Sequence, residues 1–354
     1  MPNDCEKRNE HPACGQKKAT DSLDPARESV CGLNALLKAE GRAHRGVGYK
    51  NSVSRFHMLA LSRCTELSNE LSNGEYRPAK GERHEVWEPK YRVVSSSKYR
   101  DRVPQASFSV NYFYKKIIPH LIENNYACIK GRGVDLAREK LKEILRNASE
   151  DDWCLKADMK NYFASIRHEA LYGELGEYIT DPWAMEYFRQ TVENATAPDG
   201  LDLGSEIYQL SATSFLNRLD HMLDDGKYIR FQDDLLYVGT KPDCVRALGI
   251  IREEAARLGL VLAEKKTYMQ PVRNPIRFLG FTFWRHETGR VTLKRLPEKL
   301  RHERRKLRRM RNKGIPADRV RTHYMSVRAG LRKGSRSDLY KMDRYAKALF
   351  GEIF

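Results

Sequence analysis

The pattern of apolar and polar positions divides the chain into segments of helical and strand-like period. Apolar residues recur at helical spacing, and so predict helices, over 52–72, 112–121, 136–145, 169–178, 210–222 and 245–258. Shorter apolar runs predict strands at 85–88, 92–94, 153–158, 261–262 and 278–283. Residues 228–239 contain two apolar runs around a pair of acids, which predicts a hairpin. The order of these elements favours an α+β core.

Both ends of the chain differ from this central part. Residues 1–25 are polar and predict a flexible tail. After Trp284 the composition turns strongly basic, and Leu296, Leu300 and Leu307 mark one apolar side of the segment 294–313. This pattern predicts a two-faced basic helix in a separate helical domain, although a solvated basic helix would show the same pattern.

The net charge narrows the range of expected binding partners. The 354 residues include 64 Lys and Arg against 47 Asp and Glu, which gives a net charge of +17. Such an excess suits a polyanion, most commonly nucleic acid, although a merely soluble basic protein is the alternative. No run of about 18 apolar residues and no signal peptide are seen, so we expect a cytoplasmic protein without a membrane partner. The seven cysteines contain no Cys-x-x-Cys pair, so neither a disulfide framework nor a zinc knuckle is expected.

Pairs of adjacent acidic residues are the candidates for a catalytic site. The chain has three Asp-Asp pairs, at 151–152, 224–225 and 233–234, and only Asp233-Asp234 lies between apolar runs. Two acids at that place repel each other unless a cation lies between them. A strand that ends in Asp158 beside this hairpin would gather the carboxylates that two-metal phosphoryl transfer requires. A solvated hairpin turn is the alternative reading of the pair.

Seven segments, in order, resemble the motifs of bacterial reverse transcriptases. The central one is Lys156-Ala157-Asp158-Met159-Lys160-Asn161-Tyr162-Phe163, and Arg230-Phe231-Gln232-Asp233-Asp234 resembles the motif that is usually Tyr-x-Asp-Asp. The others are Glu88-Pro89-Lys90-Tyr91-Arg92 with Asp101-Arg102-Val103, Tyr126-Ala127-Cys128 with Gly131-Arg132-Gly133, Gly204-Ser205-Glu206-Ile207-Tyr208-Gln209-Leu210, Glu264-Lys265-Lys266-Thr267 and Phe278-Leu279-Gly280-Phe281.

The resemblance implies an α+β right-hand polymerase. Its parts would be fingers over 26–150, a palm with an antiparallel sheet over 151–283 and a short, basic, helical thumb over 284–354. The implied activity is RNA-directed DNA synthesis with two Mg²⁺ ions, for which Mn²⁺ could substitute. Asp158, Asp233 and Asp234 would be the catalytic metal ligands.

The resemblance also implies a binding site for the incoming nucleotide, formed by Lys90, Arg92, Phe163, Leu203, Gly204 and Gln209. Lys90 and Arg92 would neutralise the triphosphate, or else are ordinary surface charges. Phe163 would exclude the ribose 2′-hydroxyl, with a plain core phenylalanine as the alternative. Lys266 would protonate the departing pyrophosphate, although the neighbouring Lys265 could do so instead.

The implied partners are an RNA template, a DNA product or primer and dNTPs, with a structured non-coding RNA or an accessory protein as further possibilities. The predicted nucleic-acid contacts are Arg102, Lys294, Arg295, Arg301, Arg304, Arg305 and Arg308. A non-catalytic RNA-binding protein is the alternative of another class, and an RNA-templated RNA polymerase is disfavoured by Phe163.

Finer features resemble the enzymes of diversity-generating retroelements. Leu203 stands before Gly204, where more accurate relatives have Gln, and Gln209 agrees with that group. An apolar Leu203 cannot hydrogen-bond near the incoming nucleotide, so we expect error-prone copying, particularly opposite template adenine. The short thumb is expected to leave no room for a ribonuclease H or second DNA-binding module, which disfavours retroviral and full intron enzymes.

Three features depart from that group: the dipeptide Phe231-Gln232, Tyr208 and Ile129. Compact reverse transcriptases of phage-defence systems therefore stay close alternatives, and retron or group II intron-like enzymes share the other motifs.

Overall fold

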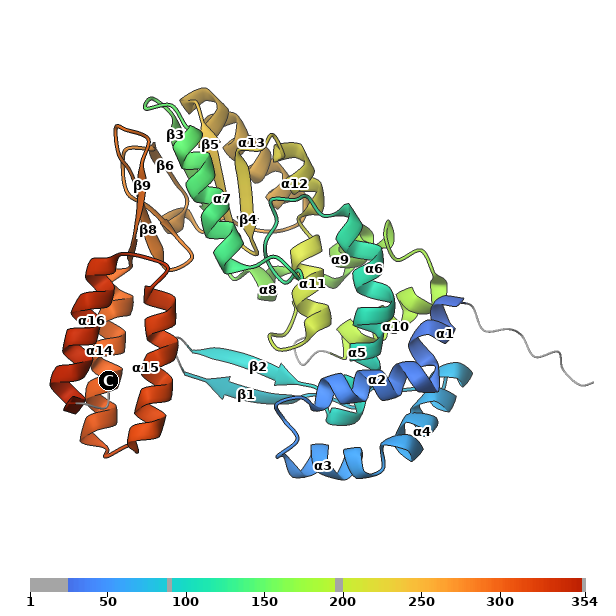
Figure 1. Ribbon diagram of the computed structural model, residues 1–354. Coiled ribbons are helices and arrows are strands. Elements are labelled where there is room, and N and C mark those ends of the chain that lie inside the picture. The colour runs from blue at the N-terminus through green and yellow to red at the C-terminus, as the bar shows by residue number, and fades with distance from the viewer. Residues whose placement is uncertain (1–24, 88–90, 195–199, 352–354) are drawn as a thin grey trace, which may run out of the picture.

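The computed structural model describes residues 25–87, 91–194 and 200–351. Figure 1 shows the N-terminal helices and a C-terminal three-helix unit on opposite sides of the molecule, with the sheets above and between them. The predicted tail 1–25 lies outside the described residues except for Pro25, which begins the first helix.

Four helices and a hairpin open the chain. They are α1 (Pro25–Cys31), α2 (Leu33–His44), α3 (Asn51–Met58), α4 (Ala60–Asn73), β1 (Glu82–Val86) and β2 (Arg92–Ser96), with the two strands antiparallel. The single helix expected over 52–72 is wrong, because the chain breaks at Leu59, where φ is −113° and ψ is 24°. The break lets α3 bury Val53 and Phe56 while α4 buries Cys64, Leu67 and Leu71 separately.

The central sheet has the strand order β4-β5-β3-β6, and all three pairings are antiparallel. Its strands are β3 (Trp153–Asp158), β4 (Tyr228–Phe231), β5 (Asp234–Gly239) and β6 (Tyr268–Pro271). The predicted strand 153–158 and the predicted hairpin over 228–239 are confirmed. Residues 261–262 form no strand, and Leu262 makes only an isolated bridge to Met159.

The other helical segments of this part of the chain precede or connect the strands of the central sheet. They are α5 (Tyr99–Phe108), the π-helical η1 (Ser109–Phe113), α6 (Tyr114–Ile117), the 3₁₀ turn η2 (Ile118–His120), α7 (Val134–Asn147), α8 (Tyr162–Ser165), α9 (His168–Gly176), α10 (Pro182–Glu193), α11 (Glu206–Ser214), α12 (Asn217–Leu223), α13 (Lys241–Arg257) and the 3₁₀ turn η3 (Glu264–Lys266). The expected helix 210–222 is divided into α11 and α12 at Phe215–Leu216.

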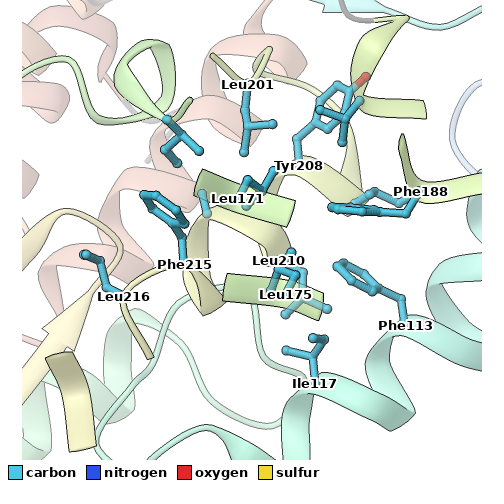
Figure 2. Packing of buried hydrophobic residues seen from close by; sticks show 14 of the residues in the cluster. Phe113, Ile117, Leu171, Leu175, Phe188, Leu201, Tyr208, Leu210, Phe215 and Leu216 are labelled. Atoms are coloured by element: carbon cyan, nitrogen blue, oxygen red, sulfur yellow. The ribbon is translucent and has the colours of Figure 1, made fainter. Parts of the chain in front are cut away.

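Both faces of the central sheet are covered, which explains its nearly continuous apolar strands. Side chains alternate between the faces of a strand. Leu235 and Tyr237 therefore join the large core with α8–α13, whereas Leu236 and Val238 join a second core under α7. Figure 2 shows part of the large core, where Leu171, Leu175 and Phe188 of α9 and α10 pack near Leu210 and Phe113.

A second sheet connects the core to the C-terminal helices. It contains β7 (Ile276–Phe278), β8 (Phe281–Arg285) and β9 (Val291–Arg295), and is followed by α14 (Pro297–Asn312), α15 (Ala317–Leu331) and α16 (Arg336–Phe350). The single strand expected over 278–283 is wrong, because Leu279 and Gly280, both with positive φ, form a turn between β7 and β8. The basic helix begins at Pro297, so Lys294 and Arg295 lie on β9 instead.

These elements confirm the α+β class with antiparallel sheets. Helices α14–α16 enclose a core of their own, which includes Leu307, Tyr324 and Met342. No described helix combines the length and apolar character needed to span a bilayer.

Candidate active site

Three aspartates meet at one end of the central sheet. Asp158 is the last residue of β3 and lies opposite Asp234, the first residue of β5, in the antiparallel register. Asp233 occupies the turn between β4 and β5. The carboxylates that sequence reasoning selected are therefore brought together, whereas the two other Asp-Asp pairs lie outside this end of the sheet.

The β4–β5 turn is tight. Gln232 adopts a left-handed conformation with φ of 56°, which is uncommon for a residue other than glycine. Asp234 already belongs to the strand, so Asp233 alone is carried by the turn. The strained conformation at Gln232 must be held by surrounding contacts.

Two lysines balance the charge of this site. The Lys266 Nζ lies 2.7 and 2.9 Å from the two carboxylate oxygens of Asp158, and the Lys156 Nζ lies 3.1 Å from Asp234 Oδ1. Asp233 has no such partner among the described ion pairs. Burial, followed by the negative charge of Asp158, raises the pKa of Asp233 to about 6.

The donor set fits divalent cations. Mg²⁺ prefers carboxylate oxygens, and burial, followed by the nearby charge of Asp158, raises the pKa of Asp233 and so disfavours its ionised form in the absence of a cation. Among the described residues no three acidic, histidine or cysteine side chains form a ready-made cluster. Lys266 and Lys156 hold Asp158 and Asp234 instead, so these ion pairs would have to open for the carboxylates to hold a metal.

Lys266 and its neighbour Lys265 differ in their contacts. Both belong to η3, but among the described contacts only the Lys266 amine reaches one of the three aspartates. Its hydrogen bond to Asp158 raises the pKa of Lys266, which keeps the amine protonated and able to donate.

The other predicted nucleotide contacts come from α8 and the segment before α11. Phe163 is half-buried and packs edge-on against Tyr162. Leu203 bridges Val94 of β2, and a Cβ on Gly204, whose φ is 124°, would lie 2.8 Å from the Ser95 carbonyl oxygen. Only glycine therefore allows the chain to pass so close to β2.

Gln209 belongs to a hydrogen-bonded group beside the turn. Its side-chain oxygen lies 3.6 Å from the Cys128 Sγ, which in turn lies 3.0 Å from Gln232 Nε2. The same Gln232 amide lies 3.0 Å from Thr213 Oγ1. A predicted nucleotide-binding residue is thus connected to the residue that precedes Asp233.

Among the predicted basic contacts in the fingers, Lys90 and the side chain of Arg92 lie outside the described residues. Arg102 lines a cavity of about 380 Å³ together with Arg42, Arg45 and the start of α11. Arg42 also pairs with Glu206. The cavity therefore offers several guanidinium groups beside Gly204 and Ser205.

The predicted contacts after Trp284 fall into two groups. Arg301, Arg305 and Arg308 are exposed on α14. Lys294 lies over Trp284 and Arg295 lies over Phe281, at 5.1 and 5.0 Å from the ring centroids. Arg304 lies 5.5 Å from the Tyr345 centroid, so its side chain packs within the helical unit.

Sequence reasoning gave no role to a buried ion pair beneath the turn, formed by Arg230 and Asp220. A signal was present, because Arg230 interrupts the apolar run Ile229-Arg230-Phe231. A charged residue at the centre of an apolar strand requires a buried partner.

Comparison with known proteins supports the motif resemblance. The sequence model of the family described as "Reverse transcriptase (RNA-dependent DNA polymerase)" matches residues 80–283, which is more than half of the chain. No curated protein sequence matches the chain.

Two telomerase structures from Candida tropicalis are among the similar solved structures. Apo telomerase has a TM-score of 0.45 and 11% identity, with 68% of this chain and 53% of that chain covered. The form truncated from the C-terminal domain has a TM-score of 0.43 and 12% identity, with 61% and 55% covered. The chain thus spans about half the length of these structures.

The family match covers every element that carries the three aspartates. The chain belongs to the reverse transcriptase (RNA-dependent DNA polymerase) family.

Proposed function

We propose that this chain is an RNA-directed DNA polymerase that makes cDNA from an RNA template. The observation that carries the proposal is the convergence of Asp158, Asp233 and Asp234 at one end of the sheet, within the segment that matches the family. Two of these carboxylates are held by lysines, and the third has a raised pKa. Such a set of acids is costly unless it serves a cation.

The three aspartates would hold two Mg²⁺ ions, or Mn²⁺ in their place. These ions, when bound, lower the pKa of the attacking 3′-hydroxyl and neutralise charge on the triphosphate. Lys266, which its contact with Asp158 keeps protonated, would donate its proton to the leaving pyrophosphate. Phe163 would lie against the sugar and disfavour ribonucleotides.

The basic surfaces would hold the nucleic acids. Arg102 with Arg42 and Arg45 gives a cavity suited to the phosphates of the template. Arg301, Arg305 and Arg308 would contact phosphates of the template–product duplex from α14.

Primer extension on an RNA template with dNTPs and Mg²⁺ tests the proposal. We expect extension by the wild-type protein and its loss in Asp233→Ala. Asp151→Ala, which changes an exposed acid in another Asp-Asp pair, is the matched control and should extend normally. Full activity of Asp233→Ala would refute the site, and RNA binding without any extension would favour a non-catalytic RNA-binding protein.

We further propose error-prone copying, as in diversity-generating retroelements. Leu203 is half-buried against β2, so an apolar side chain stands beside Gly204 where a hydrogen-bonding one would contact the nucleotide site. Gln209, which agrees with the enzymes of diversity-generating retroelements, supports the same subgroup. A role in phage defence is the alternative.

Misincorporation opposite each template base measures this property. Leu203→Gln should reduce errors opposite adenine several-fold, because the amide restores a hydrogen-bonding group. Leu136→Gln, at an exposed position on α7, should leave the error spectrum unchanged. High fidelity of the wild type at all four template bases would rule out error-prone copying.

A further inference from the structure

Arg230 and Asp220 form an ion pair in which neither side chain is exposed to solvent. Arg230 comes from β4 and Asp220 from α12, directly beneath the turn that carries Asp233. The Arg230 Nε and Nη2 atoms each lie 2.6 Å from one oxygen of Asp220. This bidentate geometry fixes the plane of the guanidinium group.

Other donors complete the environment of Asp220. The Tyr228 hydroxyl donates to Asp220 Oδ1 over 2.9 Å, and the Asn125 amide donates to Oδ2 over 3.3 Å. The carboxylate is therefore satisfied on both oxygens. Asp220 is therefore fully engaged by protein groups and is not available to bind a substrate.

The outward side of the guanidinium reaches two backbone carbonyls. The Arg230 Nη2 donates to the Thr213 carbonyl of α11 over 2.5 Å, and Nη1 donates to the Gln232 carbonyl over 3.0 Å. The second carbonyl belongs to the peptide that joins Gln232 to Asp233. Arg230 thus holds the carbonyl of this peptide, and the N–H of the same peptide belongs to Asp233.

That peptide leads directly into Asp233. Rotation of its plane would change the direction of the backbone at Asp233 and would therefore redirect the Asp233 side chain. Gln232 has a φ of 56°, so the turn relies on its contacts to keep this orientation.

Stability alone does not account for such a pair. Removing two charges from water costs several kcal/mol per ion, and well-packed apolar residues of similar volume often give equal or greater stability. The pair is better explained by the hydrogen bond from Arg230 to the Gln232 carbonyl, which an apolar residue in place of Arg230 could not form.

We propose that Arg230, itself held by Asp220, is a positioning residue that orients the Asp233 carboxylate through the Gln232–Asp233 peptide. This inference rests on the proposed function, because it assigns Asp233 to the metal site. Through the Thr213 carbonyl, the same guanidinium fixes α11, which carries Gln209, relative to the turn.

The double variant Arg230→Met/Asp220→Leu tests the proposal. Replacing both charges avoids an unpaired buried ion, so the protein should fold with an unfolding temperature close to that of the wild type. We expect its affinity for Mn²⁺ alone, measured by electron paramagnetic resonance without substrate, to fall about tenfold. Its kcat should fall by about 10- to 100-fold while the Kd for template–primer stays unchanged.

Arg257→Met/Glu174→Leu is the matched control. It removes an ion pair between α13 and α9 that does not contact the β4–β5 turn, so Mn²⁺ affinity and kcat should stay as in the wild type. If the folded Arg230→Met/Asp220→Leu variant binds Mn²⁺ and turns over like the wild type, the proposal is overturned.

Arg230→Lys provides a second route should the double variant not fold. Lysine keeps the charge beside Asp220 but cannot reach the carboxylate and both carbonyls at once. We expect the same loss of Mn²⁺ affinity, and wild-type affinity would again overturn the proposal. A wild-type protein that binds Mn²⁺ at Asp233 but extends no primer would refute the proposed function and leave the positioning role measurable.

Discussion

Lysine side chains supply the counter-charges of the predicted metal site. Lys156 lies next to Asp234 across β3 and β5, and Lys266 reaches Asp158 from η3. Both contacts join residues distant in sequence, 78 positions apart in one case and 108 in the other. The pattern of the chain identifies the acids, but only the folded structure shows which cations face them.

Replacing Lys266 with alanine should slow the chemical step. Loss of a general acid typically costs 10²- to 10⁴-fold, so we expect kcat for single-nucleotide incorporation to fall about 100-fold. Rapid-quench kinetics would measure this, with Lys265→Ala as the neighbouring control. Equal effects of the two variants would contradict the assignment of Lys266.

Residue by residue, sequence reasoning found the candidate acids but missed the contacts that support them. Asp158, Asp233 and Asp234 stand out because acids interrupt apolar runs. Arg230 also interrupts an apolar run, but neither periodicity nor spacing shows that its partner is Asp220, ten residues away. Partners of buried charges are set by tertiary packing.

At the scale of elements, the strands that carry the three aspartates were predicted well, whereas β6 and several helices were not. Residues 153–158 and 228–239 have short, distinct apolar runs, and their strands follow closely. The helical period continues through Leu59 and through Phe215–Leu216, so the pattern alone gives no reason for a break. Each break lets two shorter helices bury different faces, which is a consequence of packing.

An ion pair connects α15 and α16, and its contribution to the stability of the fold depends on pH. Arg328, followed by the hydroxyl of Tyr324, lowers the pKa of Asp343. A carboxylate with a lowered folded-state pKa stabilises the fold above its unfolded pKa of about 3.9, and this stabilisation is lost as pH falls through the folded-state pKa.

Asp343→Asn should therefore be destabilised at pH 7 by about 1 kcal/mol, a value typical of a partly exposed pair. The difference from the wild type should begin to shrink below about pH 4, where the unfolded chain becomes protonated at Asp343, and should disappear as pH falls through the lowered folded-state pKa. Urea unfolding at pH 7 and pH 3 would measure it, with Glu287→Gln in an exposed loop as the control. A difference that does not depend on pH would contradict this account.

At the scale of the molecule, the net charge of +17 is distributed over several surfaces. Exposed arginines lie on α14, and others line the cavity at the start of α11. Composition predicted an anionic partner, and the order of motifs predicted the α+β class. Which basic residues face outward could not be predicted, because Arg304 and Arg305 are neighbours that differ only in their place around the helix.

Duplex binding should depend on salt through the outward arginines. Each phosphate contact contributes about 0.9 to the slope of log K against log salt concentration. The triple variant Arg301→Ala/Arg305→Ala/Arg308→Ala should therefore reduce the slope by about 2–3 in fluorescence-anisotropy titrations. Arg304→Ala, which removes a side chain packed on Tyr345, should leave the slope unchanged. An unchanged slope in the triple variant would exclude α14 as a duplex contact.

The ring of Phe281 joins several parts of the chain. Arg138 of α7 and Arg295 of β9 lie 4.4 and 5.0 Å from its centroid, and a Cβ added to Gly334, between α15 and α16, would lie 2.6 Å from the ring. Helices α14–α16 have their own core, so this ring lies where a separately packed unit meets both α7 and the second sheet. One side chain is thus a contact shared by three parts of the chain, and a change in its packing would be felt in all three.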